Sequence, residues 1–290
     1  MRNIALVGTF FCLWLSTLFN GAMQVTMAYI LILTVGVLHG ANDIGIIRSA
    51  AADSGIRINK LKVLIYYVAT VLGILAVFAI YAPLALFLFI FISGYHFGEQ
   101  HLKSYLQRPS LFVGTVYLLY GLTILFMIFY YNVNNVVPII KDVTTFELTE
   151  TFFGYALVII ALSLISFMGI SWYKGWLRFP IYRELFYFAV LYVLFNTADL
   201  MWGFAIYFIL WHSLPSLRDQ IIYLYGKADR QGLLRYLKSS WLYWGVSLLG
   251  LFGLFFIFRK NTEFLTTILI YFLAAITFPH VIVMSQLEKH

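Results

Sequence analysis

The chain has 290 residues, of which 62% are hydrophobic and only 11% are charged, and its mean hydropathy is +0.90. A soluble globule of this size needs far more polar surface, so this composition excludes a water-soluble domain and predicts an all-α, polytopic membrane protein. The single cysteine, Cys12, excludes a disulfide framework.

Apolar segments long enough to cross a bilayer follow one another along the whole chain. About 20 residues of helix span the roughly 30 Å hydrocarbon core. Ten segments are expected to do so: 4–19, 24–47, 61–81, 84–102, 111–131, 151–172, 181–198, 200–217, 240–258 and 264–286. The first is expected to be retained, because no small-x-small cleavage site follows it. We therefore predict a single transmembrane domain over residues 1–290, a bundle of about ten helices.

The basic residues predict the orientation of this bundle. With both termini in the cytoplasm, the inner loops carry 16 of the 19 Lys and Arg residues, and only Lys141, Arg259 and Lys260 lie outside. We expect a multi-pass protein of the inner (cytoplasmic) membrane in contact with its lipid. Because the basic residues are spread over six inner segments, no nucleic-acid partner is expected. The outer stretch 132–150 and the inner stretch 217–239 are expected to be loops, the second either an interfacial amphipathic segment or an ordinary inner loop.

Four histidines lie inside apolar segments: His39, His96, His212 and His280. Each comes six to nine residues before the next Lys or Arg, on a segment predicted to run from outside to inside. A lone intramembrane histidine is more often a packing residue that is hydrogen-bonded to another helix. Four at one depth instead predict a metal site near the cytoplasmic end, and imidazole ligands suit iron, zinc or copper.

Two carboxylates follow these histidines at helical spacing. Asp43 is at i+4 from His39, and Glu99 is at i+3 from His96, so each is expected on the same helical face as its histidine. There each could accept the outer ring N–H of a metal ligand. The alternative is that both carboxylates mark solvated helix ends.

The other two histidines are set aside. His101 is five residues after His96, which turns it about 140° around the helix, and His290 is the last residue. Neither is assigned to the metal, and His101 is the reserve candidate.

Four motifs carry a resemblance to a known family. They are LHGANDIGI (38–46), SGYHFGEQH (93–101), WHSLPSLRDQ (211–220) and FPHVIVM (278–284). In this order they resemble the signature segments of the Brp/Blh family of integral-membrane β-carotene 15,15′-dioxygenases, which cleave β-carotene into two retinals for microbial rhodopsins. The resemblance implies a non-haem Fe(2+), O2 as the oxidant, and a functional link to a microbial rhodopsin. It places His39, His96 and His212 at iron-ligand positions.

The chain departs from the family pattern at two positions. Ser216 stands where the family has a second histidine four residues after the one matching His212, and Ile44 stands where many members have a histidine. His280, Ser216 through a water, or His101 could complete the site, or the metal could keep only three protein ligands. We expect His280 to do so, because its depth agrees with the other three.

Aromatic residues are abundant enough to line a tunnel for a flat polyene. The chain has 28 Phe, 21 Tyr and 7 Trp, and β-carotene, about as long as the bilayer core is thick, could enter from lipid. Five residues near the histidines are expected to contact substrate: Tyr95, Phe97, Trp202, Tyr207 and Trp211.

Three other classes of membrane protein are alternatives to an enzyme of this kind. A transporter should carry carboxylates or broken helices at mid-membrane, whereas almost all acidic residues here, Asp199 included, lie near the ends of predicted helices. A haem protein would use histidine pairs as axial ligands. A non-catalytic carotenoid- or retinal-binding protein associated with a rhodopsin is the main alternative to an enzyme.

Overall fold

The computed structural model describes residues 1–258 and 264–287. Among these the chain is all-helical, as predicted, and no strand is found; the only bridge pairs Leu106 with Leu177. Arg259, Lys260 and His290 lie outside the described residues.

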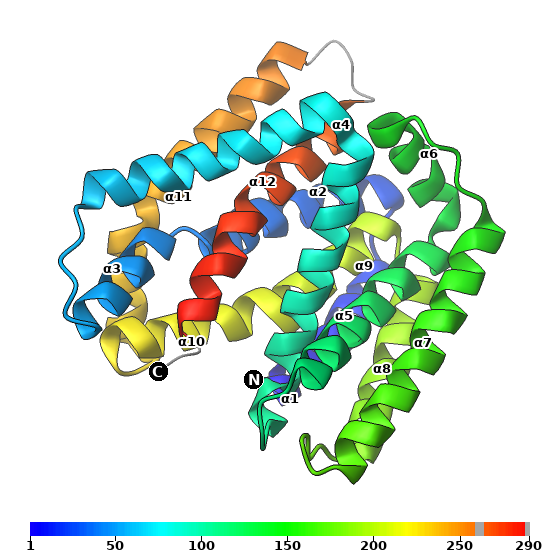
Figure 1. Ribbon diagram of the computed structural model, residues 1–290. Coiled ribbons are helices and arrows are strands. Elements are labelled where there is room, and N and C mark those ends of the chain that lie inside the picture. Colours follow the sequence, from blue (N-terminus) through cyan, green and yellow to red (C-terminus); the bar gives the residue numbers. More distant parts are fainter. Residues whose placement is uncertain (259–263, 288–290) are drawn as a thin grey trace. The chain divides into compact units, whose positions relative to one another are not determined.

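The helices follow one another with short connections. In chain order they are α1 (Arg2–Ser16), α2 (Gly21–Leu31), the π-helix η1 (Ile32–Gly36), α3 (Asp43–Asp53), α4 (Lys60–Leu102), the 3₁₀ helix η2 (Lys103–Tyr105), α5 (Leu111–Tyr131), α6 (Val133–Thr144), α7 (Glu150–Tyr173), α8 (Ile181–Thr197), α9 (Leu200–Ile206), the π-helix η3 (Tyr207–Ser213), α10 (Leu214–Tyr225), α11 (Arg230–Phe258) and α12 (Phe264–Leu287). Figure 1 labels most of them. They form two compact units, one of residues 1–29 and 90–212 and one of 30–89 and 213–290.

Six stretches of the described chain are helical, long and apolar enough to cross a membrane. They are 60–105, 111–131, 150–173, 200–225, 230–257 and 266–285. Arg2–Ser16 and Gly21–Gly36 are apolar but shorter. The polytopic membrane class is therefore supported, whereas the expected count of about ten spans is not confirmed.

The predicted spans 61–81 and 84–102 are continuous in one helix, α4, with a kink between them. Tyr81 has non-helical backbone angles (φ −152°, ψ 79°), two residues before Pro83. Proline lacks a backbone N–H and its ring clashes with the preceding turn, so it bends a helix without having to end it.

The predicted span 24–47 is broken in the middle. Its helical part ends at Leu38, a turn covers 39–42, and α3 begins at Asp43. Gly40 and Asn42 are poor helix formers, and Asp43 is favourable in the first turn of a helix. His39 therefore lies at the end of one helix, and Asp43 at the start of the next.

The two expected loops are largely helical. Residues 132–150 contain α6, which ends at Thr144 and is followed by Thr145 with a left-handed φ of 64°. Residues 217–239 contain the end of α10 and the start of α11, joined through Gly226 with φ 83°. That positive φ favours glycine, which lets the chain turn sharply between the two helices.

Within the first unit, α5 lies beside α7 and contacts α8 (Figure 1). The last part of α4 approaches α5 so closely that a Cβ built on Gly98 would lie 1.8 Å from the carbonyl oxygen of Tyr117, and one on Gly121 would lie 1.8 Å from that of Gly94. Gly94 and Gly98 are thus packing residues. His96, two residues from each, points about 200° away around the helix.

Within the second unit, α12 contacts α3 and α11, and α10 contacts α11 and α3 (Figure 1). A small apolar cluster of Leu217, Ile221 and Tyr236 joins α10 to α11, with Leu38 packed against it. This contact holds the segment before His39 against the α10–α11 hairpin.

The charge distribution makes a topological prediction. Reporter domains fused after Asn20 and after Lys60 should lie on opposite sides of the membrane, because 16 of the 19 basic residues then fall on one side. Alkaline phosphatase activity paired with fluorescence of a cytoplasmic reporter measures this. Two fusions on the same side would contradict the predicted orientation.

Candidate metal centre

His39 and His280 form a close pair in the second unit. Their ring centroids lie 4.7 Å apart with an interplanar angle of 86°, and a ligand nitrogen of one lies within 4.8 Å of a ligand nitrogen of the other. Both side chains are buried. Two imidazoles that present nitrogens this close together can bind one metal ion.

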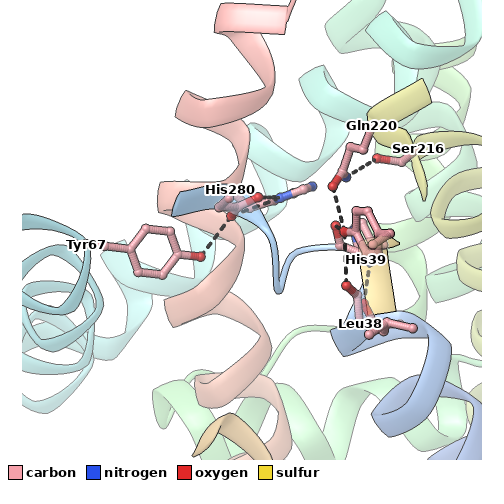
Figure 2. Close-up of polar contacts among 9 residues, drawn as sticks. Leu38, His39, Tyr67, Ser216, Gln220 and His280 are labelled. Atoms are coloured by element: carbon pink, nitrogen blue, oxygen red, sulfur yellow. Dashed lines mark hydrogen bonds and ion pairs between the residues drawn. The ribbon is translucent and has the colours of Figure 1, made fainter. Parts of the chain in front are cut away.

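The proton position on His280 follows from its hydrogen bonds. Its Nδ1 lies 2.9 Å and 3.2 Å from the two carboxylate oxygens of Asp43, and the Tyr67 hydroxyl donates to Oδ2 of the same carboxylate at 2.9 Å. Figure 2 shows the Tyr67 hydroxyl directed toward His280, with the dashed line of its hydrogen bond ending beside that ring. A carboxylate only accepts, so Nδ1 carries the proton, and in the neutral ring Nε2 has the lone pair that binds a metal.

His39 is held in the same tautomer by its own backbone. Its Nδ1 contacts the carbonyl oxygen of Gly36, the last residue of η1. A carbonyl also only accepts, so the lone pair of the neutral His39 ring is again on Nε2. Metal-binding histidines in proteins donate their other N–H to a carboxylate or a backbone carbonyl in this way. This donor set fits a transition metal.

The hydrogen-bond partner of Asp43 differs from the one that its spacing suggested. From its i+4 position the carboxylate could have accepted from His39, but it accepts from His280 and Tyr67. The i+4 argument needs a continuous helix, and the turn at 39–42 interrupts it. Asp43 does bind the outer nitrogen of a candidate ligand, but from a different helix.

Ser216 belongs to a buried network beside His39. Gln220 Nε2 donates to Ser216 Oγ at 3.1 Å, and the Tyr236 hydroxyl lies 2.8 Å from Gln220 Oε1. That hydroxyl also lies 3.0 Å from the carbonyl oxygen of His39 and 3.3 Å from that of Leu38, so three acceptors share its one hydrogen (Figure 2). The network ties α10 and α11 to the backbone that carries His39.

A second histidine pair lies in the first unit. The rings of His96 and His212 are 5.0 Å apart at 78°, and both are buried. The ring of Phe97 packs against His212 at 4.6 Å, and Gln100 Nε2 donates to the His212 carbonyl at 3.2 Å. His212 lies in the π-helix η3, a rare helix form found often at functional sites.

Glu99 accepts a hydrogen bond from the Tyr95 hydroxyl at 3.1 Å, one turn earlier in α4. Both Glu99 and His96 are largely buried, whereas 36% of the surface of Tyr95 is exposed. Glu99 is thus not at a solvated helix end.

The other expected substrate contacts are buried within the first unit: Phe97, Trp202, Tyr207 and Trp211. The indole N–H of Trp202 donates to Ser16 at 2.8 Å, and that of Trp211 donates to Thr9 at 2.9 Å. Contact with substrate by these residues stays a prediction.

His101 is surrounded by aromatic side chains. Its Nδ1 lies 3.3 Å from the Tyr120 hydroxyl, and its ring stacks on Trp211 at 5.9 Å with 12° between the planes. These contacts occupy one nitrogen and one face of the ring.

Three residues around the second-unit pair were missed from the sequence: Tyr67, Gln220 and Tyr236. Gln220 is at i+4 from Ser216, a spacing that could have indicated it. Tyr67 and Tyr236 come from distant parts of the chain, and no local pattern marks them.

Comparison with known proteins gives one match. A family model described as Beta-carotene 15,15'-dioxygenase matches residues 30–288. No curated protein and no solved structure matches the chain.

The hydrogen bonds of Asp43 with His280 and Tyr67 predict how substitutions change the affinity for a metal ion. Asp43→Ala should weaken Co(II) binding by about 10–100-fold, because His280 loses the acceptor that fixes its tautomer. Tyr67→Phe should cost only a few-fold, because Asp43 still holds His280. Titration of the metal-free protein with Co(II) measures both.

Tyr66→Phe is the matched control for Tyr67, because the neighbouring Tyr66 is 72% exposed. Wild-type Co(II) affinity in Asp43→Ala would show that the Asp43–His280 bond does not support a metal ligand.

Proposed function

Because the chain belongs to the beta-carotene 15,15'-dioxygenase family, we propose that it cleaves the central 15,15′ double bond of β-carotene with O2 and forms two retinals. The observation that carries the proposal is the His39–His280 pair, whose bonds to Gly36 and Asp43 leave Nε2 of each neutral ring as the metal-binding nitrogen.

The proposed metal is Fe(2+), with His39, His96, His212 and His280 as its ligands. Two buried pairs, one in each unit, support this set. Neutral imidazoles suit ferrous iron, and when bound the iron supplies the redox-active position at which O2 reacts.

The overall reaction balances without any other reactant. One carbon–carbon double bond breaks, and each of its carbons receives one oxygen atom of O2, which gives two aldehydes. No net proton and no external electron is consumed. The task left to its side chains is to hold the ligands, bind the polyene and exclude water.

The membrane provides access for this substrate. β-Carotene is apolar throughout, and an enzyme whose described residues include six helices long and apolar enough to cross a membrane can take it from lipid without transfer through water. Tyr95, Phe97, Trp202, Tyr207 and Trp211 are the proposed contacts, because they lie near His96 and His212 in sequence. Retinal as product gives the proposed link to a microbial rhodopsin.

The competing function is carotenoid or retinal binding without cleavage. It is favoured by Ser216 and Ile44, which stand where the family pattern has histidines. Expression in a β-carotene-producing host separates the two. An enzyme removes the orange colour, and retinal accumulates, whereas His39→Ala at equal expression leaves the host orange. A host that stays orange, with carotenoid copurifying with the wild-type protein, would contradict the proposed activity.

The fourth ligand can be tested against its alternative. His280→Ala should abolish iron binding and retinal formation as fully as His39→Ala, because each removes one imidazole from a buried site. Ser216→Ala should lose at most about 10–100-fold in activity, since its hydroxyl would act through neighbouring groups. Iron content and retinal yield are measured together.

His290→Ala serves as the histidine control, because His290 is the terminal residue and is assigned no role. An inactive Ser216→Ala protein together with an iron-containing His280→Ala protein would assign the fourth position to Ser216.

A further inference from the structure

The first helix is hydrogen-bonded to the stretch 200–213 that carries His212. The indole N–H of Trp211 donates to Thr9 Oγ1 at 2.9 Å, and that of Trp202 donates to Ser16 Oγ at 2.8 Å. Thr9 is fully buried, and its own hydroxyl hydrogen goes to the carbonyl of Ala5. All of α1 precedes residue 30, where the family match begins.

Trp211 is held from two further directions. The ring of His101 stacks on it at 5.9 Å and 12°, and the ring of Tyr187 meets it edge-on at 5.3 Å and 73°. With Thr9 fixing the indole N–H, these contacts from α1, α4 and α8 restrict the orientation of the side chain.

Arg2 holds the beginning of α1 close to the residues that surround Trp211. Its guanidinium forms an ion pair with Glu184 at 3.0 Å and hydrogen bonds with the Tyr105 hydroxyl and the His101 carbonyl. The other carboxylate oxygen of Glu184 accepts from Tyr120 at 2.9 Å. A cation is unfavourable at a helix N-terminus, so the buried carboxylate offsets the cost of placing Arg2 there.

His212 follows Trp211 directly, and both lie in the π-helix η3. A π-helical turn is rare and less stable than an α-helical one, so it needs surrounding contacts to keep its register. We propose that Thr9, which bonds the Trp211 indole, and Arg2, which contacts the His101 carbonyl and the Tyr187 ring, are positioning residues that hold Trp211 and thereby fix the direction of His212. The role of His212 as a metal ligand rests on the proposed function.

The test uses the full chain in lipid nanodiscs and three substitutions. Thr9→Val keeps the side-chain volume but removes the acceptor for Trp211, and Thr9→Ser keeps the hydroxyl. Thr26→Val is the matched control, because Thr26 also bonds the carbonyl four residues earlier but is exposed. Hydrogen exchange of peptides covering 207–213 and the dissociation constant for Co(II) are measured for each, together with the melting temperature.

Thr9→Val should speed exchange within 207–213 and weaken Co(II) binding by about ten-fold, while Thr9→Ser and Thr26→Val match the wild type. Unchanged exchange in 207–213 would overturn the proposal, as would faster exchange with unchanged Co(II) affinity. A uniform rise in exchange with a lower melting temperature would assign Thr9 to general stability and also overturn it. If the wild type binds no Co(II), the proposed function fails, and the exchange result still decides whether Thr9 holds the π-helical turn.

Discussion

The hydrogen bond between His280 and Asp43 is the interaction on which the second-unit site depends. It joins α12 to α3 at 2.9 Å, and both side chains are buried. A buried carboxylate is costly unless it is hydrogen-bonded, and here Nδ1 of His280 and the Tyr67 hydroxyl supply two donors. The bond that satisfies Asp43 therefore also fixes which nitrogen of His280 can bind a metal.

Hydrogen bonds between buried polar groups also help to determine how the other helices pack. Apolar helices gain little from contact with one another in lipid, so close backbone packing and hydrogen bonds decide which faces meet. The Gly98–Tyr117 approach gives the first kind of contact, and the Tyr236 hydroxyl beside the His39 carbonyl gives the second. In the second unit, the Tyr236 hydroxyl that joins α11 to α10 also bonds the backbone of His39.

The sequence predicts those parts of the fold that local pattern determines. The predicted span 111–131 has the bounds of α5, because an unbroken apolar run follows Ser110, whose side chain accepts from the N–H of Phe112. The span 24–47 was broken instead, since total hydropathy does not register the turn that begins at His39. The stretch 132–150 was expected to be a loop but contains the helix α6. The polar residues of this helix lower the mean hydropathy of the segment, so hydropathy alone did not indicate a helix.

The residues of the candidate site also differ in how far the sequence predicts them. The four histidines stand out from the sequence, since imidazoles are rare within apolar segments, and all four are buried. Their hydrogen-bond partners could not be predicted, because Asp43 and His280 are 237 residues apart and Thr9 and Trp211 are 202 apart. Such contacts depend on how helices pack, which periodicity within one helix does not describe.

The central claim is that two histidine pairs hold one iron. X-ray absorption spectroscopy of anaerobically prepared, iron-loaded protein tests it most directly, because imidazole rings give a characteristic outer-shell scattering pattern. We predict a first shell of nitrogen and oxygen alone, with about four imidazoles per iron, in keeping with the preference of ferrous iron for such ligands. A shell with only two imidazoles would show that one pair alone binds the metal and would contradict the account.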